Sequence, residues 1–186
     1  MKCSGKKLAL IGALLIAIGL LVSFLVLVMT DYDLSKLSGG KYTEKTYTVS
    51  EDFDLIGITV DTADVELVFA EGEECKVVCS ETERISYNVY INEEGCLYVE
   101  TVKANKWYNH FDLKNIFGNW GDNKVIVYLP KTEYDAISAE SDTGDIKILD
   151  DFRFESISAK SDTGDIIIRA SAEDKIWTST DTGDII

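Results

Sequence analysis

A six-residue phrase occurs three times in the sequence: Ser141–Ile146 (Ser-Asp-Thr-Gly-Asp-Ile), Ser161–Ile166 and Thr180–Ile185. The copies begin 20 and then 19 residues apart, and Asp61–Val65 is a degenerate copy in which Ala63 replaces the glycine. A fixed period of this length is typical of repeat proteins, in which stacking buries an apolar face that no single copy could bury. The sequence therefore predicts a chain folded into successive, similar layers.

Each copy has the pattern of a strand, a turn and a second strand. Ile137–Ala139 before the first phrase and Ile146–Ile148 at its end alternate apolar and polar residues, as half-buried strands do. The turn between them combines side chains that bond their own backbone with a glycine that tolerates positive φ. The predicted turn residues are Asp142, Thr143, Gly144, Asp145, Asp162, Thr163, Gly164, Asp165, Asp181, Thr182, Gly183 and Asp184.

Further strands are predicted from other apolar segments. The chain returns from one copy to the next through the segments Asp150–Ser156 and Ser171–Lys175. The difference in spacing between the copies arises in these segments, so they are expected to be exposed loops. The fold class is predicted to be all-β, a β-solenoid-like stack of strand-turn-strand repeats of about 20 residues, preceded by one N-terminal transmembrane helix. The additional strands are expected at Lys41–Ser50, Lys76–Ser80, Ile85–Ile91, Cys96–Val102 and Lys124–Leu129.

An uninterrupted apolar run extends from Leu8 to Met29. As a helix it would be about 33 Å long, close to the roughly 30 Å hydrocarbon thickness of a bilayer. The run is longer than the apolar region of a signal peptide and lacks a small-residue cleavage pattern, so an uncleaved anchor is favoured over a removed signal. Lysines precede the run and Asp31 and Asp33 follow it, which places the N-terminus in the cytoplasm.

The predicted organisation is therefore that of a single-pass protein of the bacterial cell membrane with an extracytoplasmic C-terminal domain. Residues 1–7 form the cytoplasmic N-terminus, 8–29 the transmembrane signal anchor and 30–43 a linker. Residues 44–186 form the extracytoplasmic β-repeat domain, which is expected to be incomplete at its C-terminus because Ile186 follows the third turn so closely that the rung is cut short.

The net charge of −15 is unevenly distributed along the chain. Residues 1–30 carry three lysines and no acid, so residues 31–186 carry −18. An acidic body of this kind repels phosphate groups, which excludes nucleic-acid binding, and favours cations and basic partners. The expected partners are the lipid bilayer, through residues 8–29, and an envelope protein, a cationic peptide or a glycan.

The repeat turns raise two chemical hypotheses. Stacked copies would place Asp142, Asp162 and Asp181 in one column and Asp145, Asp165 and Asp184 in another, about 4.8 Å apart. No cofactor is expected, but calcium at these carboxylates is an alternative; otherwise each carboxylate accepts turn amides and stays hydrated. Asp-Thr-Gly also surrounds the aspartates that face one another in aspartic proteases. Because three copies in tandem predict a column, the chain is not expected to be an enzyme, and a hydrolase is a remote alternative.

Aromatic residues and cysteines offer further candidates. The segment from Lys106 to Trp120 is rich in aromatic side chains, which would either form a binding patch or cover an end of the stack. Cys75 and Cys79 are too far apart on one strand to bridge directly; either could pair with Cys96, or all three are small buried side chains. The candidate binding patch consists of Trp107, Tyr108, Phe111, Phe117 and Trp120.

The order of these elements resembles a known bacterial family. The segment Thr46–Leu55, the degenerate copy, Val125–Pro130 and the tandem phrases are similar to a family of unknown function that is labelled putative adhesin and is related to the "toast-rack" envelope domains. The resemblance covers about residues 44–186 and implies a β-repeat surface domain without an established catalytic site. Members are often tethered to the membrane, and some relatives are linked to sensing of envelope stress or antimicrobial peptides.

We therefore expect a membrane-anchored, non-enzymatic module for binding or scaffolding at the bacterial cell envelope. The alternative is a sensing or regulatory component that responds to envelope stress or antimicrobial peptides. In that alternative, the acidic domain would attract cationic peptides or a basic partner domain.

Overall fold

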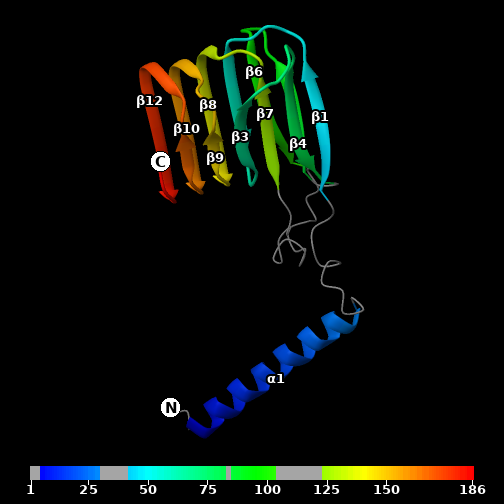
Figure 1. Cartoon of the computed structure of the whole chain (residues 1–186). Helices are drawn as coiled ribbons and strands as arrows, with labels where there is room; N and C mark the ends of the chain where they lie inside the picture. The colour runs from blue at the N-terminus through cyan, green and yellow to red at the C-terminus, as the bar shows by residue number, and fades with distance from the viewer. Residues whose placement is uncertain (1–4, 30–41, 83–84, 104–122) are drawn as a thin grey trace. The chain divides into compact units, whose positions relative to one another are not determined.

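The structure is a computed structural model, which describes residues 5–29, 42–82, 85–103 and 123–186 (Figure 1). Contacts divide the chain into two units: one contains helix α1, and the other contains the twelve strands of the described residues. The strands are β1 (Thr43–Val49), β2 (Leu55–Val60), β3 (Asp64–Phe69), β4 (Cys75–Glu81), β5 (Ile85–Ile91), β6 (Cys96–Lys103), β7 (Lys124–Leu129), β8 (Glu133–Thr143), β9 (Ile146–Ile148), β10 (Arg153–Thr163), β11 (Ile166–Ile168) and β12 (Ser171–Thr182).

Helix α1 runs from Gly5 to Met29 and contains the apolar segment of the sequence. Its side chains are described at residues 10–25, 27 and 28, and the large apolar ones among them, such as Leu10, Ile16 and Phe24, are exposed. Among the described residues, no helix combines the length and the apolar character that crossing a membrane requires.

The β unit consists of two mixed sheets of six strands each. Sheet 1 has the order β1-β4-β7-β3-β9-β11, and sheet 2 has the order β12-β10-β8-β2-β6-β5. The chain crosses from sheet 2 to sheet 1 within each of four consecutive strand pairs, so β2 with β3, β6 with β7, β8 with β9, and β10 with β11 each form one rung. The rungs follow the same order in both sheets, which gives the layered stack seen in Figure 1.

The repeated copies pair in parallel and in register. Ile157 of β10 lies between Ile137 and Ile176 in sheet 2. In sheet 1, Ile166 lies between Ile146 and Ile185. The degenerate copy joins the same columns, because Val65 of β3 pairs with Ile146 of β9. The predicted all-β class and the stacking of the 20-residue copies are therefore confirmed.

The stack is not a wholly parallel coil, because three pairs of neighbouring strands are antiparallel. β1 pairs with β4, β4 with β7, and β5 with β6. The β5–β6 pair is joined by a tight turn in which the Asn92 side chain accepts the amides of Glu94 and Cys96, and Gly95 has a φ of 75°. So short a connection makes neighbouring strands antiparallel.

The prediction that Asp150–Ser156 and Ser171–Lys175 are loops is wrong, although Ser171–Lys175 is exposed, as predicted, except for the half-buried Ala172. β10 begins at Arg153 and β12 at Ser171, and Phe152 and Phe154 are buried. Two changes together reduce the spacing between copies from 20 to 19 residues. The connection before β12 is shorter than the one before β10, and β12 has one additional residue where its register with β10 shifts, between Phe154 and Ser156. Phe152 and Phe154 place part of Asp150–Ser156 in the core, whereas Ser171–Lys175 is the exposed beginning of the edge strand β12.

The core lies between the two sheets and is built from the inward-facing residues of every rung. Leu67, Val127, Ile146 and Ile166 are fully enclosed. Cys75, Cys79 and Cys96 belong to this buried set and are free thiols. Burial raises the pKa of the Cys75 and Cys79 thiols to about 12. The thiols therefore act as small apolar side chains at neutral pH.

Candidate functional site

The repeat turns form a hydrogen-bonded column at one end of the stack. The hydroxyls of Ser141, Ser161 and Thr180 each donate to a carbonyl oxygen of the rung before, at 3.3, 2.9 and 3.0 Å. These acceptors belong to Ala63, Gly144 and Gly164. The hydroxyl at the start of each phrase thus ties its turn to the neighbouring turn, which explains why Ser or Thr recurs there.

The repeated glycines are required by the close approach of successive turns. A Cβ on Gly144 would lie 2.3 Å from the carbonyl oxygen of Ala63, and one on Gly164 would lie 2.3 Å from that of Gly144. A Cβ on Gly183 would lie 2.1 Å from the carbonyl oxygen of Gly164. These separations are far below van der Waals contact, so only glycine fits without backbone movement.

The second aspartate of each phrase forms a ladder from rung to rung. The amides of Asp145, Asp165 and Asp184 donate to Oδ1 of Asp64, Asp145 and Asp165, at 3.0, 2.9 and 2.8 Å. The Lys147 ammonium lies 2.8 Å from Asp145 Oδ2. This ammonium and the Asp165 amide together hold the pKa of the Asp145 carboxyl below its usual range. The column is therefore stabilised by donors from the chain itself.

The first aspartate of each phrase, in contrast, faces solvent. Asp142, Asp162 and Asp181 are exposed, and Lys160 Nζ lies 3.2 Å from Asp162 Oδ1. Their strands pair in parallel register on both sides of these positions, so the carboxylates form a column and not the facing pair of an aspartic protease. The described residues contain no group of three or more His, Cys, Asp or Glu side chains placed to hold a metal ion. Calcium binding stays a prediction.

The predicted aromatic patch, Trp107, Tyr108, Phe111, Phe117 and Trp120, lies outside the described residues.

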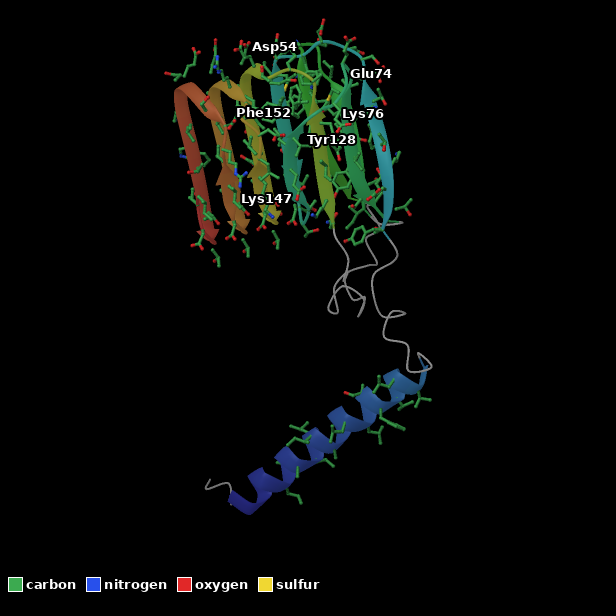
Figure 2. All side chains as sticks on the ribbon, in the orientation of Figure 1. Asp54, Glu74, Lys76, Tyr128, Lys147 and Phe152 are labelled. Carbon is green, nitrogen blue, oxygen red and sulfur yellow. The ribbon has the colours of Figure 1, made fainter. Side chains whose placement is uncertain are left out.

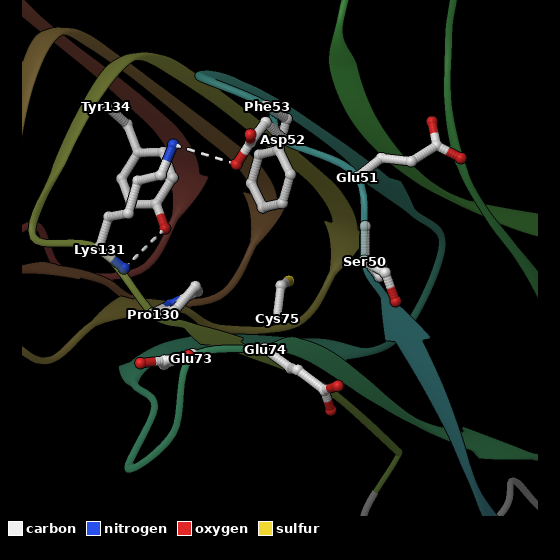
Figure 3. A pocket seen from close by; sticks show the side chains of 11 residues that line it. Ser50, Glu51, Asp52, Phe53, Glu73, Glu74, Cys75, Pro130, Lys131 and Tyr134 are labelled. Atoms are coloured by element: carbon white, nitrogen blue, oxygen red, sulfur yellow. Dashed lines mark hydrogen bonds and ion pairs between the residues drawn. The ribbon is translucent and has the colours of Figure 1, made fainter.

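A pocket opens at the end of the β unit opposite the repeat turns (Figure 3). β8 begins at Glu133 beside this pocket and ends at Thr143 beside the turns, which fixes the two sites at opposite ends. Asp54 and Glu74 mark the pocket end in Figure 2. The pocket has a volume of about 460 Å³ and lies where the loops before β2, β4 and β8 meet. Its lining consists of Val49, Ser50, Glu51, Asp52, Phe53, Glu73, Glu74, Cys75, Pro130, Lys131 and Tyr134.

The inner part of the pocket is aromatic and uncharged. Phe53 and Tyr134 stack with ring centroids 5.8 Å apart, and Tyr134 stacks on Phe154 at 6.1 Å. The Tyr134 hydroxyl accepts the Lys131 amide at 3.2 Å, and burial raises the pKa of this phenol to about 12. With the Cys75 thiol also protonated at neutral pH, this surface offers a ligand apolar contact.

The rim of the pocket is acidic. Glu51, Asp52, Glu73 and Glu74 border it, whereas Lys131 is its single basic side chain. Lys131 Nζ already lies 3.8 Å from Asp52 and 3.3 Å from Asp54. Within the described part of the chain, no ion pair involves Glu51, Glu73 or Glu74. The rim thus carries uncompensated negative charge over an apolar floor.

A second hollow of about 1050 Å³ shares Glu73 and Glu74 with this pocket. It is also lined by the apolar and aromatic side chains of Val68, Phe69 and Tyr128. Phe69 is among the exposed large apolar residues of the β unit. The acidic loop between β3 and β4 therefore stands between two surfaces that offer apolar contact.

Sequence reasoning missed the pocket because its residues come from loops far apart in the chain. Phe53 and Glu73 belong to two different connections, Tyr134 lies at the start of β8, and the three share no motif. One signal was present: Tyr134 and Phe154 are 20 residues apart, which is the period of the repeat, and they pair in the sheet. A search for aromatic residues at that period would have found the aromatic column.

Comparison with known proteins places these features in a family. A cell adhesion protein of Clostridium sporogenes, described as putative, is 14% identical with a TM-score of 0.49; the match covers 75% of this chain and 68% of that one. A putative adhesin of Bacteroides fragilis is 11% identical with a TM-score of 0.43, and the match covers 77% and 75% of the two chains. No curated protein matches significantly. The sequence pattern of the Toastrack DUF4097 family matches residues 53–185, and the chain belongs to that family.

Proposed function

We propose that this protein is a non-enzymatic binding or scaffolding module of the bacterial cell envelope, tethered to the membrane through residues 8–29. The observation that carries the proposal is the pocket with an apolar floor and an acidic rim at one end of a rigid β stack. A rigid scaffold that presents a concave site formed by loops is a common arrangement for binding. The protonated thiol and phenol of that site support binding over catalysis.

Tethering is supported by the N-terminal segment. The run Leu8–Met29 has no charged residue, and Lys2, Lys6 and Lys7 precede it. The described apolar side chains of α1 are exposed to the surroundings, which is unfavourable in water and favourable in lipid.

The charge of the rim favours a second candidate function, in which the module recognises cationic peptides or a basic partner domain. Glu51, Glu73 and Glu74 have no ion-pair partner among the described residues. A lysine or arginine side chain of a ligand could place its charge at the rim and its aliphatic stem over Phe53 and Tyr134. The adjoining hollow beside Phe69 would accept apolar side chains of the same ligand.

A binding assay with a charge-matched control tests this function. We expect the full chain in detergent micelles to bind a labelled amphipathic peptide of Lys and Leu residues, with affinity that falls as salt is added. The double substitution Glu73→Gln and Glu74→Gln should weaken binding about tenfold, because each removes a charge at the site. Asp142→Asn with Asp181→Asn removes the same charge at the opposite end and should leave affinity almost unchanged.

Two results would count against the proposal. If both double variants weaken binding equally, the peptide responds to net charge and not to the pocket. If no binding is measured at low salt, the acidic rim does not recruit cationic ligands.

A further inference from the structure

We propose that the pocket of Figure 3 is one part of a longer binding cleft, which continues past Lys131 into a further cavity at the start of β8 and β10 and holds an extended peptide with several separate positive charges. This inference rests on the recognition of cationic ligands proposed above. It adds a second binding cavity to that function and specifies that the ligand is a linear chain, whose basic side chains bind at different points.

The further cavity lies at the same end of the β unit as the pocket. It has a volume of about 220 Å³, and we call it the β8–β10 cavity. Tyr134 lines both hollows, whereas Phe53 lines the pocket and Phe154 lines the cavity. These three rings form one stacked row, with successive centroids 5.8 and 6.1 Å apart. The aromatic floor therefore continues from the pocket into the cavity.

Lys131 marks the point at which the two hollows meet. Its Nζ lies 3.8 Å from Oδ1 of Asp52, which borders the pocket, and 3.3 Å from Oδ1 of Asp54, which borders the β8–β10 cavity. Figure 3 shows the Lys131 side chain extending past Tyr134 toward Asp52. Because one ammonium group reaches both carboxylates, the two acidic rims adjoin there. The Lys131 side chain is 46% exposed, so these ion pairs are weak and the ammonium group of a ligand can replace that of Lys131.

The β8–β10 cavity has negative charge that the described residues do not compensate. Arg153 is the only basic side chain among its described lining residues, and its Nη1 already lies 3.3 Å from Oε1 of Glu133. Asp135 and Glu155 form no ion pair with any described residue. They occupy equivalent positions on β8 and β10, between two pairs of residues in register, and like charges that face each other on adjacent strands are destabilising. A positive group of a ligand would relieve this repulsion, so the cavity is complementary to a cation.

The cleft therefore presents acidic groups at separate places along an aromatic floor. A cavity of about 220 Å³ admits a side chain and not a folded domain, so the ligand must be a narrow, extended chain. Each basic side chain of such a peptide would pair with one acidic place and lay its aliphatic stem on the aromatic rings. Binding at several linked points raises the affinity well above that of any single point. The acidic places are Glu73 with Glu74, Asp52 with Asp54, and Asp135 with Glu155.

The test compares a short and a long peptide that carry the same fluorescent label and are built from Lys and Leu residues. The short peptide has about six residues, which span about 20 Å when extended, and the long one continues the same sequence to about fifteen residues. We expect the full chain in detergent micelles to bind the long peptide at least about tenfold more tightly, measured by fluorescence anisotropy at low salt. A control peptide of the same length, with Gln in place of Lys beyond the short sequence, should bind like the short peptide.

Two pairs of substitutions separate the cavity from the pocket. Asp135→Asn with Glu155→Gln should weaken binding of the long peptide about fivefold and change that of the short peptide by less than about twofold. Glu73→Gln with Glu74→Gln should weaken binding of both peptides. Asp135 and Glu155 are exposed, so these substitutions should leave the fold intact, which circular dichroism checks.

Lys131→Met tests the junction between the two hollows. The substitution keeps an apolar stem but removes the ammonium group that contacts Asp52 and Asp54. Both carboxylates then become available to the ligand, and we expect the long peptide to bind about threefold more tightly. Weaker binding of the long peptide to this variant would overturn the continuous cleft.

The outcomes distinguish this inference from the function on which it rests. If neither peptide binds at low salt, the recognition of cationic ligands fails, and the extended cleft fails with it. If both peptides bind with equal affinity, or if Asp135→Asn with Glu155→Gln does not affect the long peptide, that recognition stands and the extended cleft is overturned. Spermine is a linear polycation without apolar side chains. If it displaces the long peptide at concentrations close to the Kd of that peptide, a peptide is not the specific ligand of the cleft.

Discussion

At the scale of single residues, the glycine of each repeat turn is set by backbone contact. The Cβ of an alanine at position 164 would lie 2.3 Å from the Gly144 carbonyl oxygen, and Gly164 has a φ of 152°. We expect Gly164→Ala to lower the free energy of unfolding by about 2–3 kcal/mol. Gly72→Ala is the control, since a Cβ there meets no atom within 4 Å, and it should change stability by less than about 0.5 kcal/mol. Urea unfolding measures both, and similar losses would refute the contact argument.

The two aspartates of a phrase should differ in their effects on stability. Asp145→Ala removes the acceptor of the Asp165 amide and the partner of Lys147, and we expect a loss of about 1–2 kcal/mol at neutral pH. Asp142→Ala should cost less than about 0.5 kcal/mol, because this side chain is exposed. The reverse order would show that the ladder is not stabilising.

The Asp145 contribution should also depend on pH. The fold lowers the pKa of this carboxyl, through Lys147 first and the Asp165 amide second. A group with a lowered pKa stabilises the fold above its unfolded pKa of about 3.9, and this stabilisation is lost as the pH falls through the folded value. The stability difference between the wild type and Asp145→Ala should therefore shrink in acid. A difference that grows below pH 4 would contradict this assignment.

At the scale of elements, the position of a rung decides what its side chains contribute. Ile157 and Ile176 occupy the same column of sheet 2, but the first is enclosed by rungs on both sides and the second lies at the edge. We expect Ile157→Ala to cost about 2–4 kcal/mol and Ile176→Ala less than half as much. Thermal or urea unfolding of the two variants compares them directly. Equal costs would mean that the edge rung is covered in solution.

The parallel register was predictable from the sequence, because the spacing of the repeated phrases equals the offset between paired residues of neighbouring rungs. Ile137, Ile157 and Ile176 are spaced so that stacking copies must align them, and they do align. The antiparallel strands β1, β4 and β5 were not predictable in the same way, since they lie before the tandem phrases and follow no period. Asp150–Ser156 was mistaken for a loop because its polar residues masked the buried Phe152 and Phe154.

The two candidate sites, the turn column and the pocket, also differ in whether the sequence predicts them. The turn column follows from the repeated phrase, whose hydroxyl, glycine and aspartate all take part in contacts between rungs. The pocket does not follow, because Phe53, Glu73 and Tyr134 meet only after both sheets have formed. Local sequence determines what repeats, while a site built from unrelated loops depends on tertiary packing.

At the scale of the whole molecule, the buried thiols should make the fold sensitive to alkali. Burial raises the pKa of Cys75 and Cys79 to about 12, above the value of about 8.5 for an exposed thiol. The unfolded chain therefore loses these protons first, and stability should fall between about pH 9 and pH 12 by about 1.4 kcal/mol per pH unit for each thiol. Cys79→Ala should flatten this slope in alkaline unfolding curves, and an unchanged slope would exclude the thiols as its cause.

The opposing properties of the two units predict how the protein associates with membranes. Residues 31–186 carry a net charge of −18, so they are repelled by anionic lipids and cannot hold the protein at a bilayer by charge. In the proposed function, attachment comes from apolar burial of residues 8–29. We therefore expect the full chain, expressed in bacteria, to sediment with membranes, to resist extraction by alkaline carbonate and high salt, and to be released by detergent.

Leu15→Lys with Val22→Lys adds about 5–7 kcal/mol to the insertion free energy and should move the protein to the soluble fraction. Recovery of the unmodified chain in that fraction, or its release by carbonate, would show that the segment does not anchor it.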